Sequence, residues 1–145
     1  MEIKVNNYKL RIDEENLEKI SSGNKLIYSP HWQNYLEVVE SKQYAGKLFK
    51  NLGISPAQAM DFAMLGGKDG KIEYYIIYIL PGEILEGQTS WIKKGTGYQY
   101  QGEILDICED MKISFQKEIF KLPNPIDAPL FQMNVWIHLP WILEE

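Results

Sequence analysis

Residues 27–65 carry the pattern that most restricts how this 145-residue chain can fold. Two serine–proline pairs, Ser29-Pro30 and Ser55-Pro56, each place an N-cap residue before a proline at the first helical position. After the first pair, apolar residues recur at i, i+3, i+4 and i+7, which is the spacing of one helical face. The stretch therefore predicts short helices in succession, with the first two bounded by strong start and stop signals.

Three predicted helices each present an apolar face. Their members are Trp32, Tyr35, Leu36 and Val39 in the first, Ala45, Leu48, Phe49 and Leu52 in the second, and Ala59, Met60, Ala63 and Met64 in the third. Gly53 stands where a left-handed glycine ends a helix, and Gly66-Gly67 would end the third. Helices joined this tightly must bury their faces on one another, which predicts a three-helix unit over residues 27–67.

The clearest strand pattern lies near the end of the chain. One set of alternating positions is apolar: Phe131, Met133, Val135, Ile137 and Leu139. The other set is mostly polar: Gln132, Asn134, Trp136 and His138. The run Ile72–Leu80 is apolar on both faces and predicts a buried central strand. With further strands expected over 98–107 and 112–122, residues 68–145 predict an antiparallel β-meander of four or five strands.

These patterns predict a single domain over residues 1–145. Residues 1–26 would supply a short strand and a short helix, 27–67 the helical unit and 68–145 the sheet. The expected fold class is α+β, with an N-terminal three-helix, helix-turn-helix-like unit packed on a C-terminal antiparallel β-meander.

Charge is distributed unevenly along the chain. The net charge is −5, and the excess of acid lies after residue 65, where seven basic residues meet twelve acidic ones. Residues 27–65 carry three of each. No segment has the basic surplus that phosphate contacts normally require. The acidic half instead favours a basic protein partner, by electrostatic complementarity.

The targeting signals are few. Cys108 is the single cysteine, so a disulfide framework is excluded and a cytoplasmic setting fits. The first residues lack the pattern of a signal peptide. The longest apolar run, Tyr74–Leu80, is too short to span a bilayer, which predicts no membrane partner.

The helical stretch also carries a family resemblance. The matching residues are Tyr28-Ser29-Pro30, Trp32, Val38-Val39, Leu48-Phe49 and Leu52-Gly53-Ile54-Ser55-Pro56. They resemble the helix-turn-helix at the start of many bacterial transposase-type proteins, over roughly a quarter of the chain. The resemblance implies DNA binding through the third helix, on which Gln58 and Asp61 would face outward and Gln58 would read adenine.

No catalytic, metal or cofactor site is predicted. His31 and His138 are the only histidines and are far apart in sequence, so with one cysteine they form a poor zinc set. Two acids follow Cys108 at positions 109 and 110, which opposes thiolate formation. Phosphate-binding glycine loops and nucleophile-elbow patterns are lacking.

The polar positions of the last predicted strand are candidates for partner binding. Trp136 would supply rigid contact area, while Asn134, Gln132 and His138 would supply hydrogen bonds. Alternatively, Trp136 packs beneath the helical unit and His138 is an ordinary surface residue.

The sequence alone leaves three functions open. The favoured prediction is a non-enzymatic protein of the inhibitor, immunity or adaptor type, encoded by a phage or mobile element, that acts on a protein partner. The second is a helix-turn-helix DNA-binding protein, which a homodimer would favour by gathering Lys42, Lys47 and Lys50 onto phosphates. The third is a small-ligand binder or an enzyme whose site has no recognisable sequence motif. Because the predicted third helix contains no Arg or Lys, the protein partner is preferred.

Overall fold

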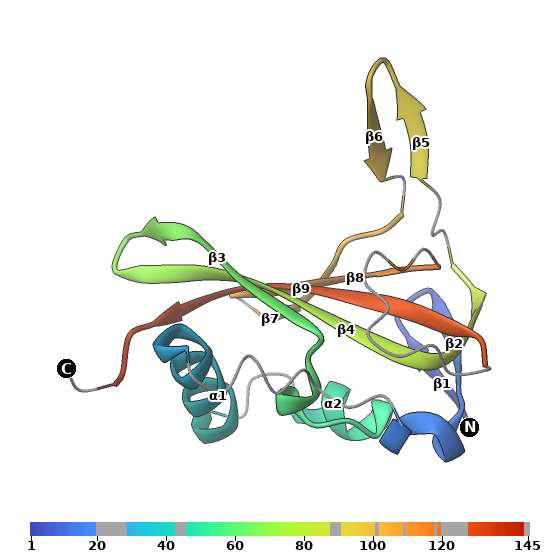
Figure 1. Ribbon diagram of the computed structural model, residues 1–145, viewed down its shortest axis with the longest axis horizontal. Coiled ribbons are helices and arrows are strands. Elements are labelled where there is room, and N and C mark those ends of the chain that lie inside the picture. Colours follow the sequence, from blue (N-terminus) through green and yellow to red (C-terminus); the bar gives the residue numbers. More distant parts are fainter. Residues whose placement is uncertain are drawn as a thin grey trace.

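The computed structural model describes residues 1–19, 29–42, 46–87, 91–100, 102–108, 110–117, 119 and 128–143. These residues form a seven-stranded antiparallel sheet in the order β1-β2-β4-β9-β8-β7, with β3 also paired to β4 (Figure 1). The strands are β1 (Glu2–Val5), β2 (Tyr8–Ile12), β3 (Asp61–Lys68), β4 (Lys71–Glu86), β7 (Leu105–Cys108), β8 (Met111–Gln116) and β9 (Leu130–Pro140).

Strand β4 is the hub of the sheet. Its 16 residues pair with β9 from Lys71 to Pro81, while its first part also pairs with β3 and its last part with β2. The change of partner falls at Pro81-Gly82, and Gly82 has a φ of 138°. A Cβ atom on Gly82 would lie 1.8 Å from the carbonyl oxygen of Arg11, so only glycine lets β2 approach here.

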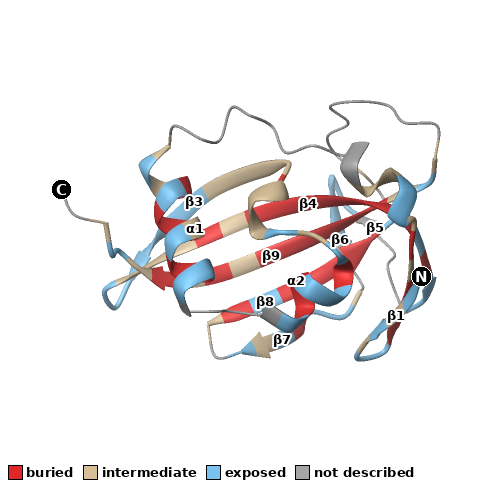
Figure 2. Cartoon of the chain, turned by 90° about the horizontal axis from the view of Figure 1, so that it is seen from below, coloured by how far each residue is buried: buried red, intermediate tan, exposed pale blue. Residues whose placement is uncertain are grey.

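Two helices, α1 (Pro30–Lys42) and α2 (Gly46–Leu52), cover one face of the sheet. Figure 2 shows them in front of β4, β9 and β8. A 3₁₀ segment, η1 (Glu14–Lys19), follows β2, and another, η3 (Pro56–Gln58), lies between α2 and β3. The helical start at Pro30 and the left-handed Gly53, with a φ of 76°, are confirmed.

The main core lies between these helices and the sheet. It includes alternate residues of β4, namely Tyr74, Ile76, Tyr78 and Leu80. It also includes the apolar set of β9, namely Phe131, Met133, Val135, Ile137 and Leu139. From the helices come Trp32, Tyr35, Val38, Val39, Leu48, Phe49 and Leu52. The apolar faces predicted for the first two helices therefore face the core, apart from Leu36, which is half-buried, and Ala45, which lies outside the described residues.

The opposite side of the sheet, here called the outer face, carries the remaining residues of the central strands. Cross-strand neighbours on it are Glu73 with His138, Tyr75 with Trp136, Ile77 with Asn134 and Ile79 with Gln132. Ile77 and Ile79 form a small second cluster with Met60, Ile119 and Leu130. The rest of the outer face is more polar than the core side.

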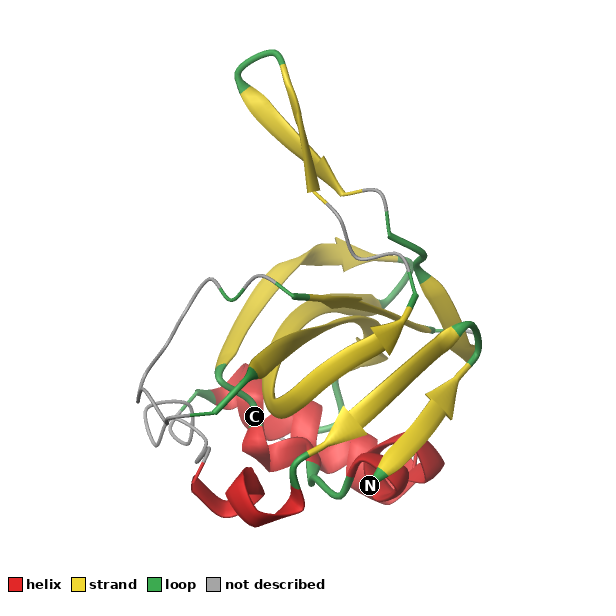
Figure 3. Ribbon diagram, turned by 90° about the vertical axis from the view of Figure 1, so that its right-hand side faces the viewer, coloured by secondary structure: helices red, strands yellow, loops and turns green. Residues whose placement is uncertain are grey.

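A separate hairpin, here called the arm, is formed by β5 (Trp91–Lys94) and β6 (Gly97–Tyr100). Among the described strands, β5 and β6 pair only with each other. Figures 1 and 3 show the arm projecting from the body on the side of the sheet opposite the helices. Gly95, with a φ of 60°, makes the tight turn at its tip.

The prediction of a three-helix, helix-turn-helix-like unit is wrong. The structure is mostly β, and its described residues hold only two α-helices. Ser55-Pro56 starts one 3₁₀ turn, in which the Gln58 side chain accepts a hydrogen bond from the Ser55 N–H at 2.7 Å, and the chain then enters β3. Residues expected to form the third helix pair with β4 instead, because β4 would otherwise leave the backbone groups of one edge unpaired.

The α+β class and the β-meander confined to residues 68–145 are corrected by the same finding. The sheet begins at the N-terminus with the β1–β2 hairpin and takes β3 from the expected helical unit. Strand β4 continues through Pro81-Gly82 to Glu86, beyond the predicted strand Ile72–Leu80. The strand expected over 98–107 divides between β6 and β7, and residues 120–122 of another lie outside the described residues.

Candidate functional site

A depression of about 460 Å³ lies at one end of the outer face. The described residues that line it are Glu73, Ile104, Asp110, Lys112, Trp136 and His138. We call it the Trp136 depression. Four separate segments supply these residues, so the depression exists only when β4, β7, β8 and β9 are assembled.

The strand register explains why these side chains meet. In the antiparallel ladders, Glu73 is opposite His138, and Trp136 is opposite both Tyr75 and Lys112. Opposed residues project from the same face of a sheet. The alternation that buries one set of β9 residues in the core therefore places Trp136 and His138 together outside it.

Two contacts between polar side chains border the depression. His138 Nε2 lies 2.7 Å from Glu73 Oε2, and Lys71 Nζ lies 2.9 Å from Asp110 Oδ2. The side chains of His138 and Glu73 are 44% and 34% exposed, so both groups remain accessible to a partner. The Asp110 side chain is only 18% exposed, so Glu73 is the more accessible of the two carboxylates.

An aromatic pair forms the inner part of the site. The rings of Tyr75 and Trp136 are stacked, with centroids 5.4 Å apart and an interplanar angle of 30°. Burial raises the pKa of the Tyr75 phenol above its ordinary value, and the negative charge of Asp61 raises it further. Tyr75 therefore stays a neutral hydrogen-bond donor, and its hydroxyl donates to Asn134 Oδ1 at 2.7 Å.

A buried amide network supports the aromatic pair. Asn134 Oδ1 also accepts from Gln132 Nε2 at 2.8 Å. Asn134 Nδ2 donates to Gln116 Oε1 at 2.7 Å and to Ser114 Oγ at 3.1 Å. All four of these polar side chains are buried. A satisfied polar network fixes the side chains that belong to it, so it orients Tyr75 and, through the stack, Trp136.

Five of the six residues predicted from the sequence to bind a partner lie on the outer face. Trp136 and His138 line the depression, while Gln132 and Asn134 lie beneath the surface in the amide network. Asp61 is opposite Ile77 in the β3–β4 ladder and so shares this face. Gln58 lies apart, in η3, where its side chain completes the turn.

Other residues of the site were not singled out from the sequence. Glu73 and Tyr75 lie in the predicted strand Ile72–Leu80, and the alternate positions 73, 75 and 77 were a signal that they share the face of Ile77. Lys112 comes from the short strand β8, and Ile104 is the residue before β7; no sequence pattern specified the register of these two strands. Ile104 is 54% exposed, which is unusual for an isoleucine beside a sheet.

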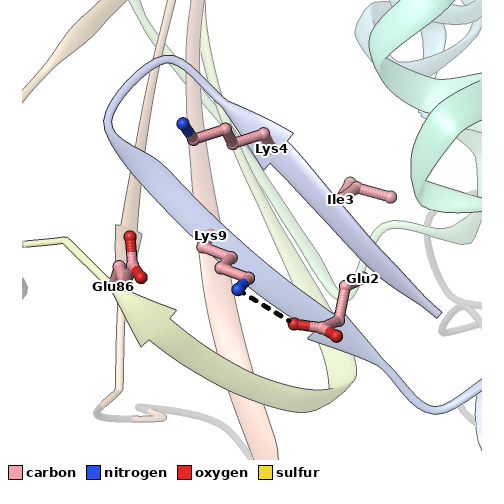
Figure 4. A pocket seen from close by; sticks show the side chains of 5 residues that line it. All are labelled: Glu2, Ile3, Lys4, Lys9 and Glu86. Carbon is pink, nitrogen blue, oxygen red and sulfur yellow. Dashed lines mark ion pairs between the residues drawn. The ribbon is translucent and has the colours of Figure 1, made fainter.

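A second hollow, of about 340 Å³, lies beside the β1–β2 hairpin. Figure 4 shows its five labelled residues, with Lys9 directed toward Glu2. The Lys9–Glu2 ion pair is 3.4 Å long, and both side chains are about half exposed. This hollow has a mixed charged lining without a buried polar group or an aromatic surface, so it offers a weaker site than the Trp136 depression.

Within the described ranges, no group of three or more His, Cys, Asp or Glu side chains is placed to hold a metal ion. No helix in the described part of the chain has both the length and the apolar character needed to cross a membrane.

Comparison with known proteins found no matching family model, curated protein or solved structure.

Proposed function

We propose that this protein is a non-enzymatic binding protein of the inhibitor, immunity or adaptor type, and that it holds a protein partner at the Trp136 depression. The observation that carries the proposal is the stacked Tyr75–Trp136 pair, held from beneath by buried amides and bordered by the accessible His138 and Glu73 side chains. A rigid aromatic residue inside a polar rim is the usual composition of a protein-binding hot spot.

The partner surface that fits best is basic. Glu73 and Asp110 border the depression, and the chain has a net charge of −5. A Lys or Arg side chain of the partner would reach these carboxylates, and Arg would also stack on the indole of Trp136. His138 would then give up Glu73 to the incoming cation, since both of these side chains are accessible.

Site-specific photocrosslinking tests this proposal. A photoreactive amino acid placed at Lys112, whose side chain is 62% exposed, lies at the rim of the depression. The same amino acid at Lys47, exposed on α2 on the helical side, is the matched control. In the source cells we expect a crosslinked protein at position 112 that is absent at position 47.

Charge reversal then checks the chemistry. Glu73→Lys should abolish the crosslink at position 112, whereas Glu40→Lys on α1 should leave it unchanged. Equal crosslinking from positions 47 and 112, or none from either, would contradict a partner at this depression.

A small ligand is the second candidate, because 460 Å³ lies within the usual size range of ligand pockets. The two candidates differ in how much surface they use. A protein partner should protect amides of β7, β8 and β9 together from hydrogen exchange, whereas a small ligand should protect only residues that line the depression.

A further inference from the structure

The arm is a two-stranded sheet separate from the main sheet (Figures 1 and 3). Its two strands of four residues each pair only with each other among the described strands. Tyr98 on β6 is 69% exposed, the largest value for any large hydrophobic side chain in the described part of the chain. An isolated two-stranded hairpin is marginally stable in water, so an arm of this kind needs a contacting surface to hold its conformation.

The register gives the arm one aromatic side. Trp91 is opposite Tyr100 and Lys93 is opposite Tyr98, so these four positions share a face of the hairpin. Trp and Tyr with a neighbouring cation are the residue types most enriched in protein contact sites.

The charge of the arm is opposite to that of the body. Residues 91–100 contain two lysines and no acidic residue, so the remaining 135 residues hold 13 basic and 20 acidic groups, a net charge of −7. A nucleic-acid occupant would bring many phosphates close to this acidic body, which argues against it. An acidic protein surface is the complementary occupant, and the body of this chain is such a surface.

The outer face offers the matching chemistry. Glu73, Asp106 and Asp110 lie on or beside it, and the Asp106 side chain is 77% exposed. Asp106 is 4.0 Å from Lys112, a long ion pair that leaves its carboxylate available to a second cation. Exposed Ile104 adds an apolar contact next to these acids.

We propose that a second copy of this chain is the occupant, and that two copies exchange arms, each arm lying across the outer face of the other copy. Tyr98 would cover Ile104 and Trp136 of the other copy. Lys94, which the register places on the other side of the hairpin next to the turn, would reach the exposed Asp106 carboxylate on the edge strand β7. Because the arm projects on the outer-face side of its own body, one two-fold axis lets both arms dock at once (Figures 1 and 3).

The arm is basic and aromatic, which is the chemistry that the Trp136 depression is proposed to select. The exchanged dimer would therefore occupy the same face as the partner, and the two would compete. In this respect the inference rests on the proposed function, but its test needs no partner and stands or falls separately.

Sedimentation velocity of the purified full chain measures the association directly. Over about 1 to 300 µM we expect a reversible monomer–dimer equilibrium that weakens as salt is raised. Tyr98→Ala and Lys94→Glu should each weaken dimerisation by about tenfold or more. Lys47→Glu makes the same charge change on α2, away from the outer face, and should leave the equilibrium unchanged.

A charge swap identifies the contacting surface. Asp106→Lys alone should weaken the dimer, and combining it with Lys94→Glu should restore most of the association. The thermal unfolding of each variant, measured at a concentration where it is monomeric, should match that of the wild type, since all these side chains are exposed.

Three results would overturn the proposal. The first is a wild-type chain that stays monomeric throughout the concentration range. The second is a dimer that neither arm variant weakens. The third is a monomer whose arm instead retards single-stranded DNA and loses that activity in Lys94→Glu, which would assign the arm to nucleic acid. A monomer that still gives the position-112 crosslink would leave the proposed function standing while removing the arm exchange.

Discussion

The hydroxyl groups of Tyr35 and Tyr78 lie 2.6 Å apart inside the core. Tyr78 donates to the carbonyl oxygen of Pro56 at 2.8 Å, so Tyr35 must donate to Tyr78. This short relay joins α1, β4 and the turn after α2. Both side chains are fully buried, so water cannot replace the bond between the two hydroxyl groups.

Removing the central hydroxyl should therefore cost more than removing the outer one. Tyr78→Phe leaves the Tyr35 O–H and the Pro56 carbonyl unpaired, and we expect it to lower the free energy of unfolding by about 1–3 kcal/mol. Tyr35→Phe loses one bond and leaves the Pro56 bond intact, so about 0.5–1.5 kcal/mol is expected. Urea denaturation of both variants measures the difference, and equal losses would contradict the assigned direction of the relay.

The same pair predicts how stability responds to alkali. Burial raises the pKa of Tyr35 above its ordinary value of 10.0. Burial, followed by the charge and the hydrogen bond of Tyr35, raises the pKa of Tyr78 well above 10.0. The folded state thus holds these protons more tightly than the unfolded chain, so their contribution is complete below about pH 10 and is lost as pH rises through the raised pKa values.

The free energy of unfolding should accordingly fall above about pH 10, and the fall should be shallower in a Tyr35→Phe, Tyr78→Phe double variant. Denaturant titrations at a series of alkaline pH values make this measurement. An identical slope in the wild type and the double variant would show that the two phenols do not govern the response.

At the scale of elements, Gly82 controls how β2 joins β4. A Cβ at this position would meet the Arg11 carbonyl at 1.8 Å, and the φ of 138° is a conformation that other residues rarely adopt. Gly82→Ala should lower the free energy of unfolding by about 3 kcal/mol or more. Gly70→Ala, at a φ of 77° with no atom near the added Cβ, is the matched control and should cost about 1 kcal/mol. Thermal unfolding that ranks the two the other way would contradict this account.

Two of the three predicted helices are confirmed because local and tertiary signals agree there. Pro30 begins α1, and the predicted apolar faces of both helices meet the sheet. The third prediction is wrong because two signals conflict. The capping pattern at Ser55 and the helical spacing of Ala59, Ala63 and Met64 are local preferences, and they yield to the backbone pairing that β4 offers.

Strand β9 was predictable almost residue by residue, since a strand with one face in the core must alternate. That alternation also placed Trp136 and His138 on one face. Their partners Glu73 and Lys112 were not predictable, because the pairing register across β4, β9 and β8 is a long-range property. The burial of Gln132 and Asn134 could not be predicted from the sequence for the same reason.

At the scale of the whole molecule, the free energy of the local unfolding that permits amide hydrogen exchange should be much lower for the arm than for the sheet. The β4–β9 ladder has 11 residue pairs in the middle of the sheet, so its amides should exchange only on global unfolding. Amides of β5 and β6 should exchange orders of magnitude faster in dilute protein and slow down as the concentration rises, if arms are exchanged. Hydrogen exchange followed at two protein concentrations separates these behaviours, and an arm as slow as β9 in dilute protein would contradict it.

The place of β4 and β9 in the chain has a consequence for folding kinetics. These central strands lie side by side but are separated along the chain by residues 87–129. The helices and the β3–β4 hairpin form from nearby residues, yet their core faces have little to bury against until β9 arrives. The loop-closure entropy of that long connection must be overcome before the main core forms. Such dominance of non-local contacts places folding in the slow, millisecond-to-second range of small domains.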